Sequence, residues 1–215
     1  MAMHSTLDDS RVRRVLDEMH AAADRVDPPL LARAKGKSLA ERAAVLGEAF
    51  IPVSPDAGRF LYALVRGAQP GTVVEFGTSF GISTIYMAAA LRDRGGGALI
   101  TTELLASKAE RAREYIDAAG LSSHVDLRVG DALQTLRGLG RDVALLFLDG
   151  AKDLYVPVLK LLEPSLKPGA LVIGDDIDLF PDALATYLSY VRDPANGYVS
   201  VKVPIGDAME LSTRA

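Results

Sequence analysis

Acidic side chains follow the ends of several short apolar runs in this sequence. The run "TVVEF" contains Glu75 and leads into Gly77 and Gly81, and the run "ALITT" ends directly before Glu103. Four more acids follow later apolar runs: Asp131, Asp149, Asp175 and Asp176. Carboxylates that gather at one place raise each other's pKa and cost stability unless a cation or a polar ligand takes them up. The pattern therefore indicates a ligand that carries positive charge and hydroxyl groups.

The glycine spacing discriminates between nucleotide ligands. A dinucleotide site needs G-x-G-x-x-G, so that a pyrophosphate can rest on a helix N-terminus, whereas this sequence has E-x-G-x-x-x-G from Glu75 to Gly81. The Glu75 carboxylate would repel a pyrophosphate, and Glu103 suits the two hydroxyls of a ribose. A nucleoside with a cationic, amine-bearing tail fits both features, and S-adenosylmethionine is such a molecule. The alternative is that Glu75 pairs with a surface lysine and the glycines only form a turn.

Two alternating periodicities predict the elements that position these acids. From Gly71 onward, short β-type runs alternate with helical segments, which predicts a parallel sheet with helices on both faces. The expected strands are 72–76, 98–102, 125–129, 143–149 and 170–175, and the expected helices are 82–93, 106–120 and 155–162. Two further runs, 198–204 and 208–214, predict an antiparallel hairpin. Ligands of open parallel sheets bind at the carboxyl ends of the strands, where the acids lie.

Three helices are expected ahead of the sheet, within residues 1–68. The first covers about Asp8 to Asp24, the second begins at Ser38 with a capping box to Glu41, and the third begins at Pro55 after Ser54 as N-cap. The first helix carries an apolar stripe of Val12, Val15, Leu16 and Met19. This stripe needs a cover, which is either a second copy of the chain or the protein's own core. We expect one domain, formed by this extension and an α/β core over 71–215.

The composition excludes several classes of function. Of the 215 residues, 49% are hydrophobic and 24% charged, as in soluble globular proteins, and the net charge of -4 argues against nucleic acid and anionic membranes as partners. There are no cysteines, and His4, His20 and His124 lack metal-ligand spacing, so any metal should be a hard cation held by oxygen. No apolar run is long enough to span a bilayer, and residues 1–14 lack an apolar signal core, so we expect a cytoplasmic protein.

Several stretches resemble one enzyme family. They are "VSPDAGRFLYALV", "VVEFGTSFGIS", "LDGAKDLY", "GDDI" and "VPIGDAMELSTR". These stretches are similar to the cation-dependent O-methyltransferases of the catechol and caffeoyl-coenzyme A type, and the resemblance covers essentially the whole chain. It implies a Rossmann-like class I methyltransferase fold with a seven-stranded sheet, S-adenosylmethionine as donor and a homodimer. It also implies a divalent cation, with Mg²⁺ expected first and Ca²⁺ or Mn²⁺ as other choices.

The resemblance further implies which residues bind the cofactor and the metal. The cofactor positions are Val53, Glu75, Gly77, Thr78, Ser83, Glu103, Asp131, Ala132 and Asp149. The metal positions are Asp149, Asp175 and Asp176, and the general base is Lys152. Asp131 could instead cap the helix that begins "DALQTL". The family usually has Asp-Asn where this chain has Asp175-Asp176, and the alternative for this pair is capping of the helix in "FPDALATYL".

The expected reaction is methylation of one hydroxyl of a catechol-like aromatic acceptor. A hard dication held by three carboxylates keeps positions open for two vicinal oxygens and lowers the pKa of a hydroxyl. Lys152 could then remove the proton, if the metal lowers the lysine pKa from its usual value of about 10.4. Tyr155 either lines the acceptor pocket or lies buried behind the strand. Two other functions stay open: a metal-independent methyltransferase of another small molecule, and a nucleoside-binding protein without catalysis.

Overall fold

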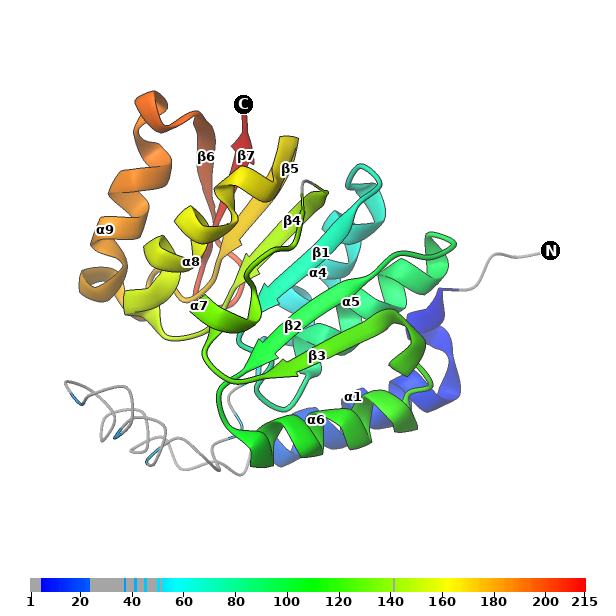
Figure 1. Ribbon diagram of the computed structural model, residues 1–215. Coiled ribbons are helices and arrows are strands. Elements are labelled where there is room, and N and C mark those ends of the chain that lie inside the picture. Colours follow the sequence, from blue (N-terminus) through cyan, green and yellow to red (C-terminus); the bar gives the residue numbers. More distant parts are fainter. Residues whose placement is uncertain are drawn as a thin grey trace.

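The computed structural model describes residues 5–23, 37, 41, 45, 50, 52–140 and 142–215. Its centre is a seven-stranded sheet with helices on both faces (Figure 1). The strands are β1 (Thr72–Phe76), β2 (Leu99–Glu103), β3 (Val125–Val129), β4 (Val143–Leu148), β5 (Leu166–Gly174), β6 (Tyr198–Val203) and β7 (Met209–Arg214). The predicted α/β fold is therefore confirmed.

The strands follow the order β3-β2-β1-β4-β5-β7-β6. Strands β1 to β5 are parallel, whereas β7 runs antiparallel to both β5 and β6. The predicted C-terminal hairpin is confirmed, with β7 placed inside the sheet and β6 at its edge. The winding direction reverses between β1 and β4, and open sheets of this kind bind ligands at the carboxyl ends of such a strand pair.

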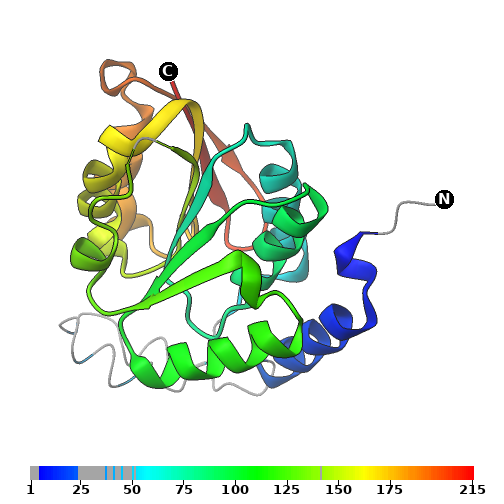
Figure 2. The same ribbon diagram turned by 45° about the vertical axis from the view of Figure 1, so that its right-hand side comes forward.

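Helices cover both faces of the sheet, as Figures 1 and 2 show from two sides. Each face buries an apolar core under its own helices. One face carries α1 (Ser10–Ala23), α4 (Pro55–Gly67), α5 (Ile82–Asp93) and α6 (Ala106–Ala118). The other carries α7 (Ala132–Thr135), α8 (Tyr155–Leu162) and α9 (Pro181–Arg192). Short 3-10 turns are η1 (Thr6–Asp8), η2 (Ser122–His124), η3 (Lys152–Leu154), η4 (Glu163–Ser165) and η5 (Pro194–Asn196).

Helix α4 begins as the sequence predicts. The Ser54 hydroxyl accepts a hydrogen bond from the Ala57 backbone N–H at 3.2 Å, and Pro55 opens the first turn. Gly58 on this helix lies against α5 so closely that a Cβ atom there would come within 2.3 Å of the Tyr86 ring. Glycine at this position therefore lets the two helices approach each other.

Helix α1 covers most of the range predicted for the first helix. Its apolar stripe is buried in the core of the same chain, where α1 packs against α5 and α6: Val12 and Met19 are 0% exposed, Val15 2% and Leu16 6%. The protein's own core is thus the cover, and the stripe no longer supports a second copy; a homodimer stays a prediction. The helix expected from Ser38 falls outside the described residues.

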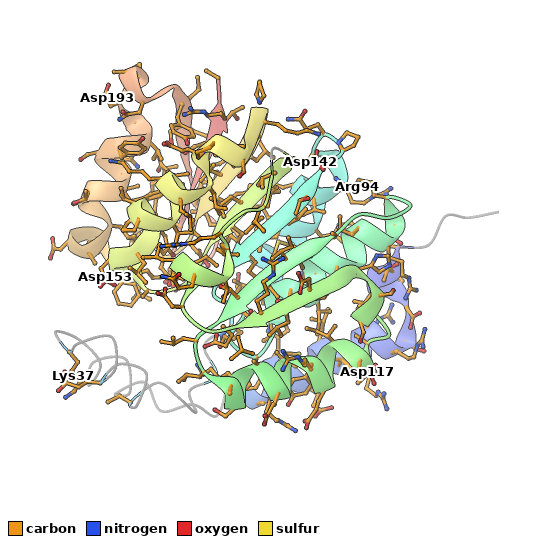
Figure 3. The ribbon with its side chains drawn as sticks, in the orientation of Figure 1. Lys37, Arg94, Asp117, Asp142, Asp153 and Asp193 are labelled. Carbon is orange, nitrogen blue, oxygen red and sulfur yellow. The ribbon has the colours of Figure 1, made fainter. Side chains whose placement is uncertain are left out.

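The acids singled out in the sequence lie at one end of the sheet. Arg94 and Asp142 lie in loops that lead into the amino ends of β2 and β4, whereas Asp153 lies beyond the carboxyl end of β4 (Figure 3). The acids singled out in the sequence all follow carboxyl ends or lie close to them. Within the described ranges, no helix has both the length and the apolar character needed to cross a membrane.

Candidate active site

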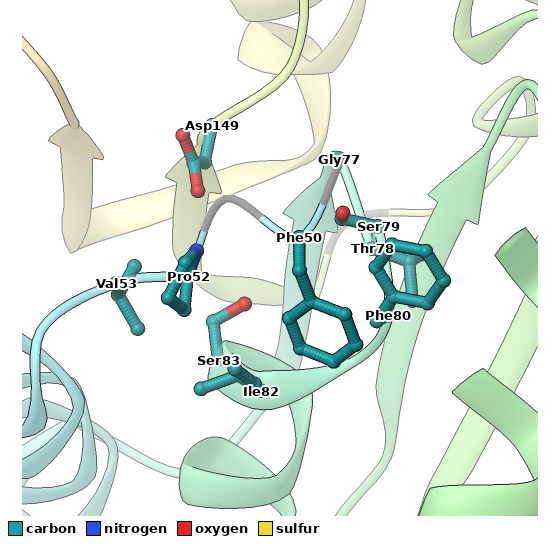
Figure 4. A pocket seen from close by; sticks show the side chains of 10 residues that line it. All are labelled: Phe50, Pro52, Val53, Gly77, Thr78, Ser79, Phe80, Ile82, Ser83 and Asp149. Carbon is teal, nitrogen blue, oxygen red and sulfur yellow. The ribbon is translucent and has the colours of Figure 1, made fainter. Parts of the chain in front are cut away.

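A pocket lies at the carboxyl ends of β1 and β4 (Figure 4). Its lining residues are Phe50, Pro52, Val53, Gly77, Thr78, Ser79, Phe80, Ile82, Ser83 and Asp149. Half of these were predicted for the cofactor: Val53, Gly77, Thr78, Ser83 and Asp149. The sequence reasoning missed Ser79 and Phe80, although their place between the two loop glycines was a usable signal. It also missed Phe50, whose ring stacks on Phe80 with 4.3 Å between centroids.

The glycine turn after β1 sets the shape of this pocket. Gly77 has φ +106°, and a Cβ atom there would lie 2.7 Å from the Asp149 backbone. Only glycine combines this backbone conformation with so close an approach. Gly81, with φ +90°, occupies the N-cap position of α5. The turn predicted from the spacing is thus present, and it brings the end of β1 against the residue that follows β4.

Glu75 lies inside the wall of the site and not on its surface. Its side chain is 0% exposed, and its carboxylate accepts hydrogen bonds from Ser83, from Thr84 Oγ1 at 2.5 Å and from Thr101 Oγ1 at 2.6 Å. Burial raises the pKa of Glu75, while these hydroxyls act to lower it. The partners are hydroxyls, so the alternative of a surface lysine is wrong. Glu75 acts on the pocket indirectly, because its carboxylate orients the hydroxyl of Ser83, which lines the pocket.

Glu103 joins the loops that follow β1 and β2. Its Oε2 accepts the Ser79 backbone N–H at 2.8 Å, and its Oε1 accepts the Leu105 N–H at 2.9 Å. Ser79 has φ +48°, an uncommon conformation for a residue with a side chain. The buried Lys108 donates to Ser79 Oγ at 3.4 Å, and its Nζ lies 5.2 Å from the centre of the Phe80 ring. Each Glu103 oxygen keeps a lone pair that a hydroxyl can use.

Asp131 and Ala132 lie outside the pocket of Figure 4. The exposed Asp131 is the N-cap of α7, where its carboxylate accepts the Leu133 N–H at 2.9 Å. The capping alternative is therefore confirmed for this residue. Ala132, the first residue of α7, is 5% exposed and belongs to the core.

Lys152 lies between two of the acids predicted to bind metal. Its Nζ is 2.7 Å from Asp176 Oδ2 and 3.2 Å from Asp149 Oδ1, and it donates a hydrogen bond of 2.8 Å to the Tyr155 hydroxyl. The same Nζ lies 5.1 Å from the Tyr155 ring centre and 5.6 Å from that of Phe180. With its side chain 10% exposed, the ammonium is enclosed by two carboxylates and two rings.

The charges in this cluster shift the pKa values of its members. Burial acts to lower the Lys152 pKa, but Tyr155, Asp149 and Asp176 outweigh it and raise the pKa well above its usual value. Lys152 is therefore held as an ammonium, and a lowered pKa in the presence of a metal stays a prediction. Burial raises the pKa of Asp149 well above its usual range despite Lys152, and burial together with Asp176 raises the pKa of Asp175 to about 7. The acids need a positive partner, and Lys152 supplies it.

The three predicted metal ligands, Asp149, Asp175 and Asp176, form an acidic cluster beside Lys152, in which their charges act on one another. Asp175, 6% exposed, accepts the Asp176 N–H at 2.9 Å, while Asp176 has φ +64° and is paired with Lys152. Among the residues that the structure describes, no three or more histidine, aspartate and glutamate side chains are grouped to hold a metal. In this arrangement Lys152 pairs with two of the acids, and a ligand role for all three stays a prediction. The capping alternative for Asp175 and Asp176 is wrong, since Phe180 is the N-cap of α9.

Comparison with known proteins decides the family. A family model described as a methyltransferase domain matches residues 74–177. Catechol O-methyltransferase B of Danio rerio is 30% identical over 199 residues, which cover 89% of this chain and 72% of that protein. The chain belongs to the S-adenosylmethionine-dependent O-methyltransferases of the catechol and caffeoyl-coenzyme A type.

Two further matches show how much of the chain the similarity covers. A catechol O-methyltransferase of Niastella koreensis is 37% identical over 138 residues, but the match spans only 62% of this chain and 62% of that relative. Among solved structures, a cofactor-bound protein from MTB superposes with a TM-score of 0.69 at 26% identity, covering 93% of this chain and 95% of that one. The likeness in fold extends over nearly the whole O-methyltransferase chain.

Within this O-methyltransferase, the residues that the resemblance gives as base and metal ligand, Lys152 and Asp149, form an ion pair of 3.2 Å, and their roles stay predictions. The sequence left two alternatives for Tyr155, a pocket wall or a buried ring behind the strand, and the buried alternative is confirmed. Tyr155 is 0% exposed, so it is not a pocket wall, and its hydroxyl donates to the Asp175 backbone carbonyl oxygen at 3.3 Å. This hydroxyl connects the segment after β4 to the end of β5.

Proposed function

We propose that this O-methyltransferase methylates one hydroxyl of a vicinal dihydroxy aromatic acceptor, with a divalent cation at Asp149, Asp175 and Asp176. The observation that supports the proposal most is the double placement of Asp149. This residue lines the pocket at the glycine turn, and it also pairs with Lys152 in the acidic cluster. A donor bound in the pocket and an acceptor bound at the cluster would meet at this side chain.

The residues present fit a hard divalent cation in their chemistry. Carboxylate oxygens are the ligands that Mg²⁺ and Ca²⁺ prefer, and Asp149 and Asp176 already share one positive group, the Lys152 ammonium. A cation held by these oxygens would bind vicinal hydroxyls of the acceptor and would make a bound hydroxyl more acidic. In the structure described here, the positive charge of Lys152 compensates the negative charges of Asp149 and Asp176.

The chain's own residues supply the rest of the reaction. A cation bound to the acids would lower the Lys152 pKa, and the amine form of Lys152 would then take the proton of the acceptor hydroxyl. The acceptor oxygen then bonds to the methyl carbon as the carbon–sulfur bond breaks, and S-adenosylhomocysteine leaves. Val53, Gly77, Ser83 and Glu103 hold the donor so that oxygen, carbon and sulfur lie in line, which is a gain from proximity and orientation.

The test is methyl transfer from labelled donor to catechol with Mg²⁺, before and after exhaustive chelation. We expect turnover that chelation abolishes and Mg²⁺ restores. Lys152→Met should bind the donor normally in calorimetry yet lose turnover by roughly 10² to 10⁴, as for a missing general base. Normal turnover by Lys152→Met contradicts the base role, and no methylation of any vicinal dihydroxy aromatic contradicts the substrate class.

A second candidate is metal-independent methylation of a small hydroxylated molecule. The observation that favours it is the Lys152 ammonium, which already provides Asp149 and Asp176 with a positive partner. The same experiment separates the two candidates, because full activity after exhaustive chelation supports only the second.

A further inference from the structure

The Tyr155 ring is fixed by three elements that meet behind the acidic cluster. Tyr155 opens α8 and is 0% exposed. Its ring meets Phe76, at the end of β1, edge-on with 6.4 Å between centroids, and meets Tyr187 of α9 in the same way at 5.4 Å. Edge-to-face contacts of this kind favour one ring orientation. The position of the Tyr155 hydroxyl is therefore set by packing.

This hydroxyl uses both of its hydrogen-bonding capacities inside the site. It accepts from Lys152 Nζ at 2.8 Å and donates to the Asp175 backbone oxygen at 3.3 Å. Lys152 follows β4 and Asp175 follows β5, so a single oxygen atom connects the two loops. The other close polar partners of Lys152 are carboxylates, Asp149 and Asp176, and both draw the ammonium toward themselves. Of the three groups that accept from Lys152, which are Asp149, Asp176 and Tyr155, only Tyr155 is neutral.

We propose that Tyr155 is a positioning residue, whose hydroxyl holds the Lys152 side chain at a fixed place between Asp149 and Asp176 and in register with the end of β5. The inference rests on the proposed function for its kinetic consequence, but its structural part concerns the protein without cation, donor or acceptor. Loss of the hydroxyl frees Lys152 to move and leaves the Asp175 carbonyl without this donor. The lysine then spends less time where the acceptor hydroxyl must be.

The test compares Tyr155→Phe with Tyr198→Phe. Tyr198 is also buried, at 4% exposed, and its hydroxyl donates to Glu163 at 2.9 Å, away from Lys152. Both variants keep their rings and lose one buried hydroxyl beside a charged group. Limited acylation with acetic anhydride, followed by peptide mass spectrometry, measures labelling of Lys152 relative to the exposed Lys160.

We expect Tyr155→Phe to raise relative labelling of Lys152 several-fold and Tyr198→Phe to leave it at the parent level. With catechol and Mg²⁺, Tyr155→Phe should lower kcat roughly ten- to hundredfold, the range of a lost hydrogen bond to a charged group. The KM for the donor should not change. Parent-level labelling of Lys152 in Tyr155→Phe overturns the inference. If the parent methylates no acceptor, the proposed function fails, whereas the labelling result still decides the role of Tyr155.

Discussion

Lys152 and Asp176 form the shorter of the two ion pairs at the site, with 2.7 Å between Nζ and Oδ2. The resemblance to the family leads one to expect asparagine at position 176, which would offer only a neutral oxygen. Here the extra carboxylate gives Lys152 a second anionic partner beside Asp149. A cation bound to these acids would compete with a lysine of the same chain, so a substitution at position 176 tests the proposed metal requirement.

Replacing Asp176 by asparagine should raise the Mg²⁺ concentration needed for half-maximal activity. The variant keeps an oxygen ligand but loses a full charge, and we expect an increase on the order of tenfold. A Mg²⁺ titration of catechol methylation measures it. The matched control is Asp178→Asn, an exposed acid two residues away that pairs with Lys202 at 2.7 Å. An identical Mg²⁺ requirement in Asp176→Asn and the parent would refute a ligand role for this residue.

Removing the Glu103 carboxylate should weaken donor binding. Glu103→Ala loses an acceptor that orients two backbone N–H groups, and we expect a loss of about 1.5 to 3 kcal/mol in binding free energy. Calorimetry should show the same loss for S-adenosylmethionine and S-adenosylhomocysteine, because a contact with the ribose does not involve the sulfur. Glu114→Ala on the outer side of α6 is the control. A loss confined to S-adenosylmethionine would instead place Glu103 near the sulfonium.

The stability of the fold should depend on pH through Glu210. This residue is 0% exposed; burial acts to raise its pKa, but hydrogen bonds from Arg192, at 2.8 and 2.6 Å, and from Ser200, at 2.6 Å, lower the pKa below 4.5. Because the folded-state pKa is the lower one, the contribution is full above pH 4.5 and is lost as the pH falls through the folded-state pKa.

Thermal melts between pH 7 and pH 3 check this dependence. Glu210→Gln should melt several degrees lower than the parent at pH 7, and the difference should shrink as the medium is acidified. The exposed Glu110→Gln should follow the parent at every pH. A difference that stays constant down to pH 3 would mean that Glu210 does not stabilise the fold through its charge.

The contact between α4 and α5 should not tolerate a methyl group at position 58. Gly58→Ala would place a Cβ atom within 2.3 to 2.6 Å of the Tyr86 ring, and overpacking of this kind costs about 1 to 3 kcal/mol. Gly67→Ala, at the end of the same helix, meets no atom within 4 Å and should be neutral or stabilising. Chemical denaturation of both variants makes the comparison, and equal stability would show that Tyr86 moves aside without cost.

The elements of this fold were predictable because each has a local signature. Period-2 and period-3.6 patterns located the strands and helices, and Ser54 with Pro55 marked the start of α4. Gly77 and Gly81 marked the turn after β1, since their spacing reflects a backbone conformation that other residues adopt at a cost. The alternation of elements indicated a parallel sheet, but local pattern carries no information on strand order, so the position of β7 had to come from the structure.

The candidate site was less predictable, because its properties depend on distances between segments. The sequence places Asp149, Asp175 and Asp176 at strand ends, yet which acid pairs with Lys152 is a matter of loop geometry. The Lys152 pKa depends on such distances too, because Tyr155 and the acids around the lysine raise it well above its usual value. The sequence also did not indicate that the Glu75 carboxylate would be enclosed by three hydroxyls, which come from α5 and β2.

The position of β7 between β5 and β6 has a consequence for the way the protein is made. During synthesis, β5 leaves the ribosome with one edge unpaired, and α9 and β6 follow before β7 exists. Strand β6 bonds only to β7 in this sheet, so it has no place to dock in the meantime. The loop with Asp175 and Asp176 therefore gains its full support only after β7 has inserted between two older strands. A nascent chain therefore contains Asp175 and Asp176 before it contains β7, the strand that pairs with β5. Until β7 is made, the unpaired edge of β5 is exposed to aggregation, from which chaperones protect nascent chains.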